Sequence, residues 1–286
     1  MTKAPYTLRL PEVQTTPVVF ASPHSGRDYP WGFLRDTVLD ECAIRSSEDA
    51  FVDILFDEAP KFGAALLLAN APRAFIDLNR AGEELDPALV EGVRRISHNP
   101  RIASGLGVIP RVVSNGRSIY SGKMSLDAAR GRIRDFWRPY HDRLQMLLDD
   151  TRLQHGQVIL IDCHSMPHEA IDTAMPPGEK KPEIVLGDRF GAAAAPDIVE
   201  RIEAAFVAEG LHVVRNAPFA GAYTTQHYGR PSRRQHVVQV EIDRSLYMNE
   251  RLVRPNGNFS AFKAMMGRVV SQLAEIRGQD MPLAAE

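Results

Sequence analysis

Short apolar runs alternate with longer amphipathic segments along the 286 residues of the chain. The short runs are rich in aliphatic residues, and most are bounded by Gly, Pro or Asn, which is typical of buried β-strands. They predict strands at Val18–Ala21, Ala64–Ala69, Ala74–Ile76, Val158–Asp162, Ile184–Leu186, Leu211–Val214 and His236–Ile242.

The amphipathic segments predict helices. From about Ser47 to Lys61, apolar residues recur at i, i+3 and i+4 spacing, and a serine can cap the start. A longer helix is expected from Ser125 to Gly156, with a kink near Pro139 because proline removes a backbone hydrogen bond. Two further helices are predicted at Pro196–Gly210 and about Ser260–Arg277.

This alternation is typical of the α/β class, with a mostly parallel sheet covered by helices on both faces. We expect a single domain over residues 1–286, since the pattern shows neither a linker nor an internal repeat. Two longer segments, Ala81–Asn115 and Met166–Pro182, are predicted to be loops. Long loops in a compact domain are often functional.

Composition excludes several classes of protein. The formal net charge of −2 and a pI near 6.5 do not favour binding to nucleic acid or an anionic membrane. Apolar stretches are far shorter than the ~20 residues that span a bilayer, and the N-terminus lacks the apolar core of a signal peptide. With only two cysteines, Cys42 and Cys163, a cytoplasmic location is expected. The nucleotide-binding patterns GxxxxGK[ST] and GxGxxG are absent, as is the GxSxG of serine hydrolases.

Two histidines follow predicted buried strands. His24 comes after Val18–Ala21, and His164 after Val158–Asp162. Because ligands of open α/β sheets bind beyond the carboxyl ends of the strands, both side chains are expected at one edge of the sheet. A single histidine there is usually structural, whereas a pair makes a metal or catalytic site equally plausible.

A metal site would also need a carboxylate, because catalytic zinc often takes two histidines and one carboxylate besides water. Glu48 and Asp49, at the start of the next predicted helix, are the candidates, although acidic residues there also complement the helix dipole. Asp162 lies two residues before His164, so the two side chains share one face of an extended chain. Asp162 can therefore orient the histidine.

The predicted strand near residue 240 ends in charged residues. Valine and isoleucine alternate there with Gln239, Glu241 and Asp243. Burying a carboxylate in a sheet covered on both faces is unfavourable unless the charge is paired or used. Glu241 is therefore a candidate general base beside a metal. The alternative is an edge strand with one solvated face.

Cationic residues supply candidates for substrate binding. Asn79 and Arg80 follow a strand-like run, and a guanidinium can bind a carboxylate through two hydrogen bonds or polarise a carbonyl. His227 and Arg230 lie in a glycine-containing stretch just before the Glu241 strand, where a substrate loop is expected. For any one of these arginines, a plain surface role is the alternative.

Taken together, these motifs resemble the N-formylglutamate amidohydrolase family. Each is weak alone, but they occur in the order of the family and span residues ~17 to 250. The matching segments are Ala21–Gly26, Ser47–Asp53, Ile76–Arg80, Ile161–Pro167, Leu186–Arg189 and Gln239–Tyr247.

The resemblance implies a fold similar to zinc carboxypeptidases and aspartoacylases, with a mixed sheet between helices in three α/β/α layers. It implies hydrolysis of N-formyl-L-glutamate to formate and L-glutamate, a late step in one route of histidine breakdown. It also implies a divalent metal, most simply Zn²⁺, held by His24 and His164 with Asp49 or Glu48. Glu241 matches the strand-end glutamate of the family, and we assign it the role of general base. Asn79 and Arg80 resemble an Asn-Arg pair that holds substrate in the wider carboxypeptidase-like group.

One segment departs from the family. Gln226 stands where an arginine is expected to bind substrate. This departure leaves open a related metallo-amidase or carboxypeptidase-like hydrolase that acts on another N-acyl amino acid or a small peptide. A non-catalytic member that binds an acidic metabolite is a further alternative, although all candidate residues are present. The expected partner is a small-molecule substrate, and the oligomeric state is not determined by the sequence.

Overall fold

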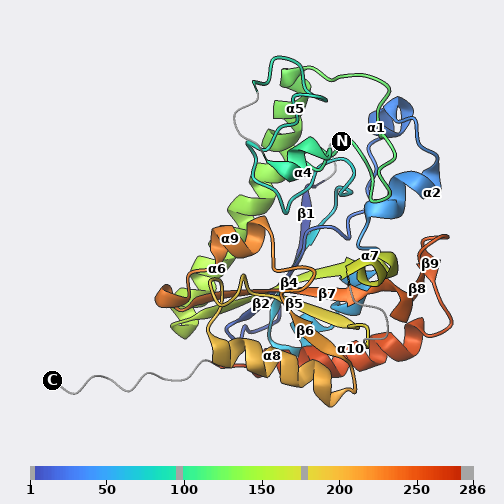
Figure 1. The fold of residues 1–286 in the computed structure, drawn as a ribbon. Helices are drawn as coiled ribbons and strands as arrows, with labels where there is room; N and C mark the ends of the chain where they lie inside the picture. Colours follow the sequence, from blue (N-terminus) through green and yellow to red (C-terminus); the bar gives the residue numbers. More distant parts are fainter. Residues whose placement is uncertain (1–3, 95–98, 175–179, 278–286) are drawn as a thin grey trace.

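A seven-stranded sheet runs through the centre of the computed structural model (Figure 1). The structure describes residues 4–94, 99–174 and 180–277. The strand order is β1-β3-β2-β4-β7-β5-β6. The strands are β1 Tyr6–Arg9, β2 Val18–Ser22, β3 Ala65–Ala69, β4 Val158–Met166, β5 Ile184–Gly187, β6 Val213–Arg215 and β7 Gln235–Asp243.

The sheet is mixed. The four central strands, β3, β2, β4 and β7, run parallel to one another. On the two sides of this group, β1 pairs antiparallel with β3, and β5 pairs antiparallel with β7. Strand β6 is parallel to β5 at the far edge. The predicted α/β class with a mixed, mostly parallel sheet is confirmed.

Helices and ordered loops cover both faces of the sheet. On one face, Phe20, Ile161 and Val240 pack against α3 (Val52–Leu55), α8 (Pro196–Ala208) and α10 (Phe259–Ala274). On the other, Val19, Leu160 and Val237 pack against α6 and surrounding segments. Figure 1 shows α8 and α10 below the sheet and the second layer above it. That layer contains α1 Trp31–Asp36, α2 Glu41–Ile44, α4 Pro100–Ala103, α5 Leu126–Arg132, α6 Arg138–His155 and α9 Tyr223–Tyr228.

The predicted helix from Ser47 to Lys61 is wrong. The segment instead contains the 3₁₀ turn Arg45–Ser47, the short helix α3 and a second 3₁₀ turn, Ala59–Phe62. Asp49 donates its backbone N–H to the carbonyl of His24 at 3.0 Å, and Phe51 has a left-handed φ of 68°. This tertiary hydrogen bond outweighs the weak helical preference of the segment and draws Asp49 to the end of β2.

The strand pattern also differs in three places. The predicted strand at residues 74–76 is wrong, because this segment forms a turn. The N–H groups of Phe75 and Ile76 both donate hydrogen bonds to the carbonyl of Pro72. Strand β1 was not predicted, because it is a four-residue edge strand with alternating exposure. Strand β4 extends to Met166, so His164 lies inside the strand and not beyond it.

The predicted long helix has an irregular turn before Pro139. Helix α5 continues into a π-helical turn, Ile133–Trp137, and α6 then runs to His155. Proline lacks the N–H of a normal helical bond and its ring crowds the preceding turn, which a wider turn relieves. Gly156, with a left-handed φ of 70°, follows the end of α6.

The two predicted loops contain short helices. Helix α4 lies within Ala81–Asn115, and α7 (His168–Ala174) lies within Met166–Pro182. Residues 95–98 and 175–179 of these segments are outside the described residues. A separate two-stranded sheet joins β8 (Met248–Asn249) to β9 (Arg254–Pro255). In the described part of the chain, no helix is both long and apolar enough to cross a membrane.

Candidate active site

The candidate site lies at the carboxyl ends of β2, β4 and β7. Alternation along β4 places Asp162 and His164 on the same face as the core residue Leu160. The parallel register then sets Gln239 beside Asp162 and Glu241 beside His164. A strand register therefore brings together side chains that lie almost 80 residues apart.

His24, Asp49 and His164 form a buried group that can hold a metal ion. Their ligand atoms all lie within 4.8 Å of one another. Asp49 Oδ2 is 2.9 Å from His164 Nδ1 and 3.4 Å from His24 Nδ1. Burial alone would raise the pKa of Asp49, but its interactions with both histidines hold that pKa well below the usual value. The carboxylate is therefore ionised at neutral pH.

The far sides of both histidines face carboxylates. His24 Nε2 lies 2.8 Å from Asp77 Oδ1, and His164 Nε2 lies 3.1 Å from Asp162 Oδ2. Carboxylates in this position orient metal-binding imidazoles and make them stronger ligands. Asp162 lies beside His164 as expected, but neither of its oxygens makes a hydrogen bond, so its orienting role stays a prediction. Asp77 was missed as a site residue, although it lies two residues before Asn79.

Three observations fit this group to a divalent cation. Two histidines and one carboxylate are a common donor set for catalytic zinc. His24 Nδ1 is buried and makes no hydrogen bond, so it has a free lone pair for a cation. The site also gathers four buried carboxylates, Asp49, Asp77, Asp162 and Glu241, and a cation would offset part of their negative charge.

Glu48 lies outside the metal-binding group. Its backbone is extended, so its side chain points away from that of Asp49. The Glu48 carboxylate accepts hydrogen bonds from Tyr29 Oη at 2.6 Å and Arg45 Nε at 3.0 Å. The prediction of Glu48 as an alternative ligand is thus corrected, and Asp49 occupies the position.

Glu241 has the properties expected of a general base. It is buried beside His164, and burial is the main reason that its pKa rises to about 7. Gln239 Nε2 donates a hydrogen bond to Glu241 Oε1 at 2.8 Å. This bond leaves Oε2 available and fixes the orientation of the carboxyl group. Gln239 was missed, but it shares the polar face of β7 with Glu241, which is the signal that could have identified it.

Asn79 joins the metal-binding group to helix α9. Its Oδ1 accepts the backbone N–H of Thr224 at 2.8 Å, and its Nδ2 lies 3.2 Å from His164 Nε2. Gln239 Oε1 similarly accepts the N–H of Ala222 at 3.1 Å. Both ends of the Asn79 amide are thus engaged within the protein, and its predicted role in substrate binding stays a prediction.

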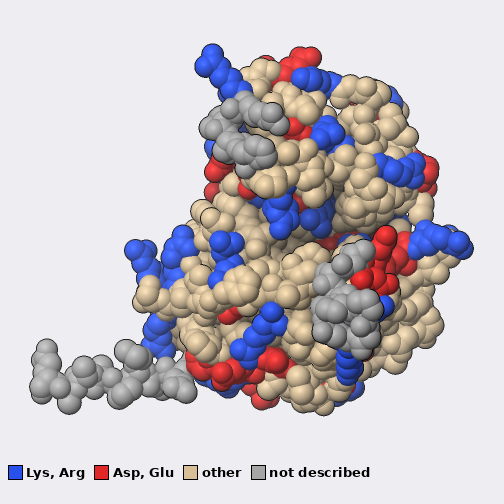
Figure 2. Space-filling view, viewed as in Figure 1, with Lys and Arg blue, Asp and Glu red and all other residues tan. Residues whose placement is uncertain are grey.

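An arginine-rich pocket of about 770 Å³ adjoins this group. The predicted substrate-binding residues Arg80, His227 and Arg230 all line it, as does Gln226. Arg80 is buried and its Nε makes no hydrogen bond, and burial lowers the pKa of its guanidinium. Figure 2 shows basic side chains along the hollow between the part of the molecule with α4 and the part with α9.

Two further arginines of this pocket, Arg101 and Arg189, were missed by the sequence analysis. Arg101 belongs to α4, and Arg189 follows β5 in the Leu186–Arg189 motif. The neighbouring Gly187 is required there, because a Cβ would lie 2.6 Å from the backbone N of Gly221. No carboxylate among the described residues pairs with the side chains of Arg80, Arg101, Arg189 or Arg230. Glu83 and Glu84 also line the pocket, but its four arginines outnumber them, and a net positive lining favours an anionic ligand.

Comparisons with known proteins agree with this arrangement. The sequence is 30% identical to an N-formylglutamate deformylase of Pseudomonas putida over 241 residues, which is 82% of each protein. It is 28% identical to an N-formylglutamate deformylase of Pseudomonas aeruginosa over 244 residues, or 82% of this chain and 83% of the relative.

Solved structures show the same fold. A crystal structure of N-formylglutamate amidohydrolase from Ralstonia eutropha JMP134 matches with a TM-score of 0.89 and 34% identity, covering 96% of this chain and 98% of the other. A gene product of Agrobacterium tumefaciens shares the fold with a TM-score of 0.61 and 18% identity, over 96% and 97% of the two chains. The family model for N-formylglutamate amidohydrolase matches residues 16–248, which include every group of the candidate site. The chain therefore belongs to the N-formylglutamate amidohydrolase family.

Proposed function

We propose that this protein is a metal-dependent amidohydrolase that converts N-formyl-L-glutamate to formate and L-glutamate. The observation that carries the proposal is the juxtaposition of the buried His24–Asp49–His164 group with Glu241 and an arginine-rich pocket. The names of the family and of the relatives supply the substrate.

His24 Nδ1, Asp49 Oδ2 and His164 Nδ1 would hold the ion, for which Zn²⁺ is the simplest choice. Such an ion supplies Lewis acidity, lowering the pKa of water toward ~7 and polarising a carbonyl. The protein contributes orientation, because Asp77 is hydrogen-bonded to His24 Nε2 and Asp162 lies 3.1 Å from His164 Nε2.

Glu241 takes the proton from the attacking water and delivers it to the departing amine nitrogen of glutamate. Its pKa near 7 suits both transfers, since the carboxylate accepts a proton readily and its acid form releases one readily. Gln239 holds one oxygen of Glu241, so the proton is carried on the other.

The arginines bind and neutralise the substrate. Arg80 and Arg230 are assigned to the carboxylates of glutamate or to the developing oxyanion, with His227 beside them. Arg73 adds positive charge close to the reacting group. Burial would lower the pKa of its guanidinium, but the carboxylates of Asp77, Asp49 and Glu241 raise it.

Gln226 favours a second candidate, hydrolysis of another N-acyl amino acid. This neutral residue lines the pocket among the arginines and accepts, through its backbone carbonyl, a hydrogen bond from Arg230. A neutral amide tolerates an uncharged substrate side chain better than an arginine does.

The test is release of formate from N-formyl-L-glutamate by purified protein, before and after chelation and after zinc is returned. A panel of N-formyl-L-aspartate, N-formyl-L-glutamine and N-acetyl-L-glutamate separates the two candidates. Chelator-sensitive formate release that prefers N-formyl-L-glutamate supports the first. Zinc-dependent activity on another member of the panel alone would replace the substrate, and no hydrolysis at all by zinc-loaded protein would overturn the proposal.

A further inference from the structure

Arg244 binds the oxygen of Asp49 that does not face the histidines. It follows β7 in a 3₁₀ turn, and only 5% of its side chain is exposed. Arg244 Nη2 donates to Asp49 Oδ1 at 3.0 Å, whereas Asp49 Oδ2 lies between the two histidines. The two oxygens of one carboxylate are thus divided between a guanidinium group and the candidate metal position.

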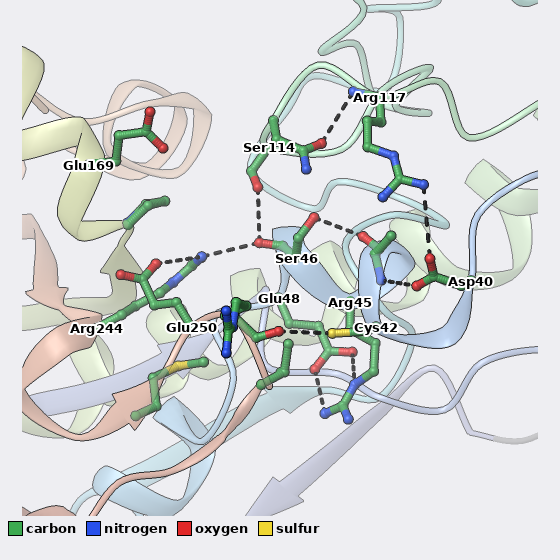
Figure 3. Close-up of a pocket in the computed structure, with 16 residues that line it drawn as sticks. Asp40, Cys42, Arg45, Ser46, Glu48, Ser114, Arg117, Glu169, Arg244 and Glu250 are labelled. Atoms are coloured by element: carbon green, nitrogen blue, oxygen red, sulfur yellow. Dashed lines mark hydrogen bonds and ion pairs between the residues drawn. The ribbon is translucent and has the colours of Figure 1, made fainter.

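The guanidinium group is itself fixed from several sides. Arg244 Nε donates to Ser165 Oγ at 3.1 Å, and Nη1 donates to the carbonyl of Ser46 at 3.2 Å. Glu250 Oε2 lies 4.0 Å from Nη1. Figure 3 shows Arg244 in the wall of a second pocket, directed toward Ser46 and Glu250. A planar group held by hydrogen bonds at three nitrogens has little freedom to turn.

We propose that Arg244 is a positioning residue that makes Asp49 a ligand through Oδ2 alone. The inference rests on the metal site of the proposed function. Holding Oδ1 fixes the direction of the carboxylate before an ion arrives, and removes a second oxygen that would otherwise compete for a coordination position. A position left open in this way is one that water or substrate needs in a catalytic site.

The same contact gives a reason for a buried arginine at this position. Asp49 is fully buried, and an ionised carboxylate without a compensating charge would be strongly unfavourable. Arg244 adds a fixed positive charge to the support that the two histidines give. It does so from the side of Asp49 opposite the histidines, where it leaves the metal position free.

The experiment measures zinc affinity in the full-length protein. Protein stripped with a chelator is titrated with Zn²⁺ against a chromophoric competitor, for the wild type and for R244M, R244K and R251Q. Arg251 is the matched control, because it lines the same second pocket but no contact of its side chain with the metal-binding group is present among the described residues. Melting temperatures of the metal-free proteins show whether each variant folds.

R244M is expected to weaken zinc binding about 10- to 100-fold, the usual effect of removing a group that orients a metal ligand. R244K should recover only part of the lost zinc affinity, because an ammonium group cannot make the separate hydrogen bonds that the three nitrogens of a guanidinium make. R251Q should bind zinc as the wild type does. In the cobalt-substituted protein, the visible absorption of R244M should weaken, because a carboxylate that binds through both oxygens raises the coordination number.

Wild-type zinc affinity and an unchanged cobalt spectrum in folded R244M would overturn the inference and leave the metal site intact. If R244M does not fold, R244K decides, since it keeps a positive charge but cannot hold Asp49 Oδ1 while also bonding Ser165 and Ser46. Weaker zinc binding by folded R244K supports the inference, and wild-type binding overturns it. A wild-type protein that binds no zinc would overturn both this inference and the proposed function.

Discussion

The metal-binding group and the arginine pocket lie side by side but are built differently. The metal-binding group is supplied by strands or by segments tied to them, and its members are almost fully buried with their charges paired. The pocket is lined by loops and by the short helices α4 and α9, and its arginines have no carboxylate partners among the described residues. One region is a buried centre built on strands, and the other is a loop-lined pocket whose four arginines range from buried Arg80 to exposed Arg101 and Arg230.

Under the proposed function, this difference assigns chemistry and recognition to separable parts of the molecule. Substitutions in the buried group should remove the metal or the chemical step, whereas substitutions in the pocket should change substrate binding. Asn79 and Gln239 are the exceptions, since their amides connect the two regions.

The largest effect is expected from H24A, D49A or H164A. Each removes one of the three converging ligand atoms, so the zinc content of purified protein should fall from about one ion per chain to nearly none, and hydrolysis should be lost. Metal analysis measures the first effect directly. Unchanged zinc content in any of the three variants would remove that residue from the ligand set.

E241Q should separate metal binding from the chemical step. It keeps the shape of the side chain and its contact with Gln239 but cannot accept a proton, so turnover should fall at least ~10²-fold while zinc remains bound. Steady-state kinetics and metal analysis on the same preparation give both quantities. Turnover close to that of the wild type would exclude Glu241 as the base.

R80M should act mainly on recognition. Loss of one charge-assisted hydrogen bond to a substrate carboxylate, worth roughly 1.5–3 kcal/mol, should lower kcat/KM by about 10- to 100-fold without loss of zinc. Arg215, an arginine that is ion-paired to Glu203 away from the site, provides the control in R215M. Equal kcat/KM values for R80M and R215M would contradict the assignment.

The rate should depend on pH through Glu241. The base must be ionised, and burial raises its pKa to about 7, so kcat/KM should rise with pH and level off above the pKa. A bound cation would lower this pKa, so we expect the midpoint of the acid limb at or below about pH 7. A pH–rate profile of the zinc-loaded protein tests this, and a midpoint well above 7 would contradict it.

E48Q should have the smallest effect on zinc binding and turnover, because Glu48 lies outside the metal-binding group. Glu48 interacts with Tyr29 and Arg45, so its replacement should leave zinc content and kcat unchanged while lowering the free energy of unfolding by about 1 kcal/mol. Denaturant unfolding measures the second effect. Loss of zinc from E48Q would contradict the placement of Glu48 outside the metal-binding group.

The sequence pointed to candidate residues at the ends of strands more readily than to charged residues in turns. His164 was proposed because it follows a buried strand, and Glu241 because it alternates with apolar residues along one. Asp77, Arg73, Arg101 and Arg189 were missed because they lie in turns or short helices, where no periodicity indicates direction. The false helix at 47–61 has the same origin, since apolar spacing carried no information about the bond between Asp49 and His24.

The sequence alone determined the α/β class, most of the strands and the residue types of the candidate site, because these depend on local periodicity and on the chemistry of side chains. Only the tertiary structure decided between Glu48 and Asp49. Neighbouring residues in an extended segment point in opposite directions, and the segment's attachment to β2 sets which of them faces the histidines. Tertiary packing also gathered arginines from distant loops around one pocket. Such a placement depends on contacts between residues far apart in the chain, which local patterns do not encode.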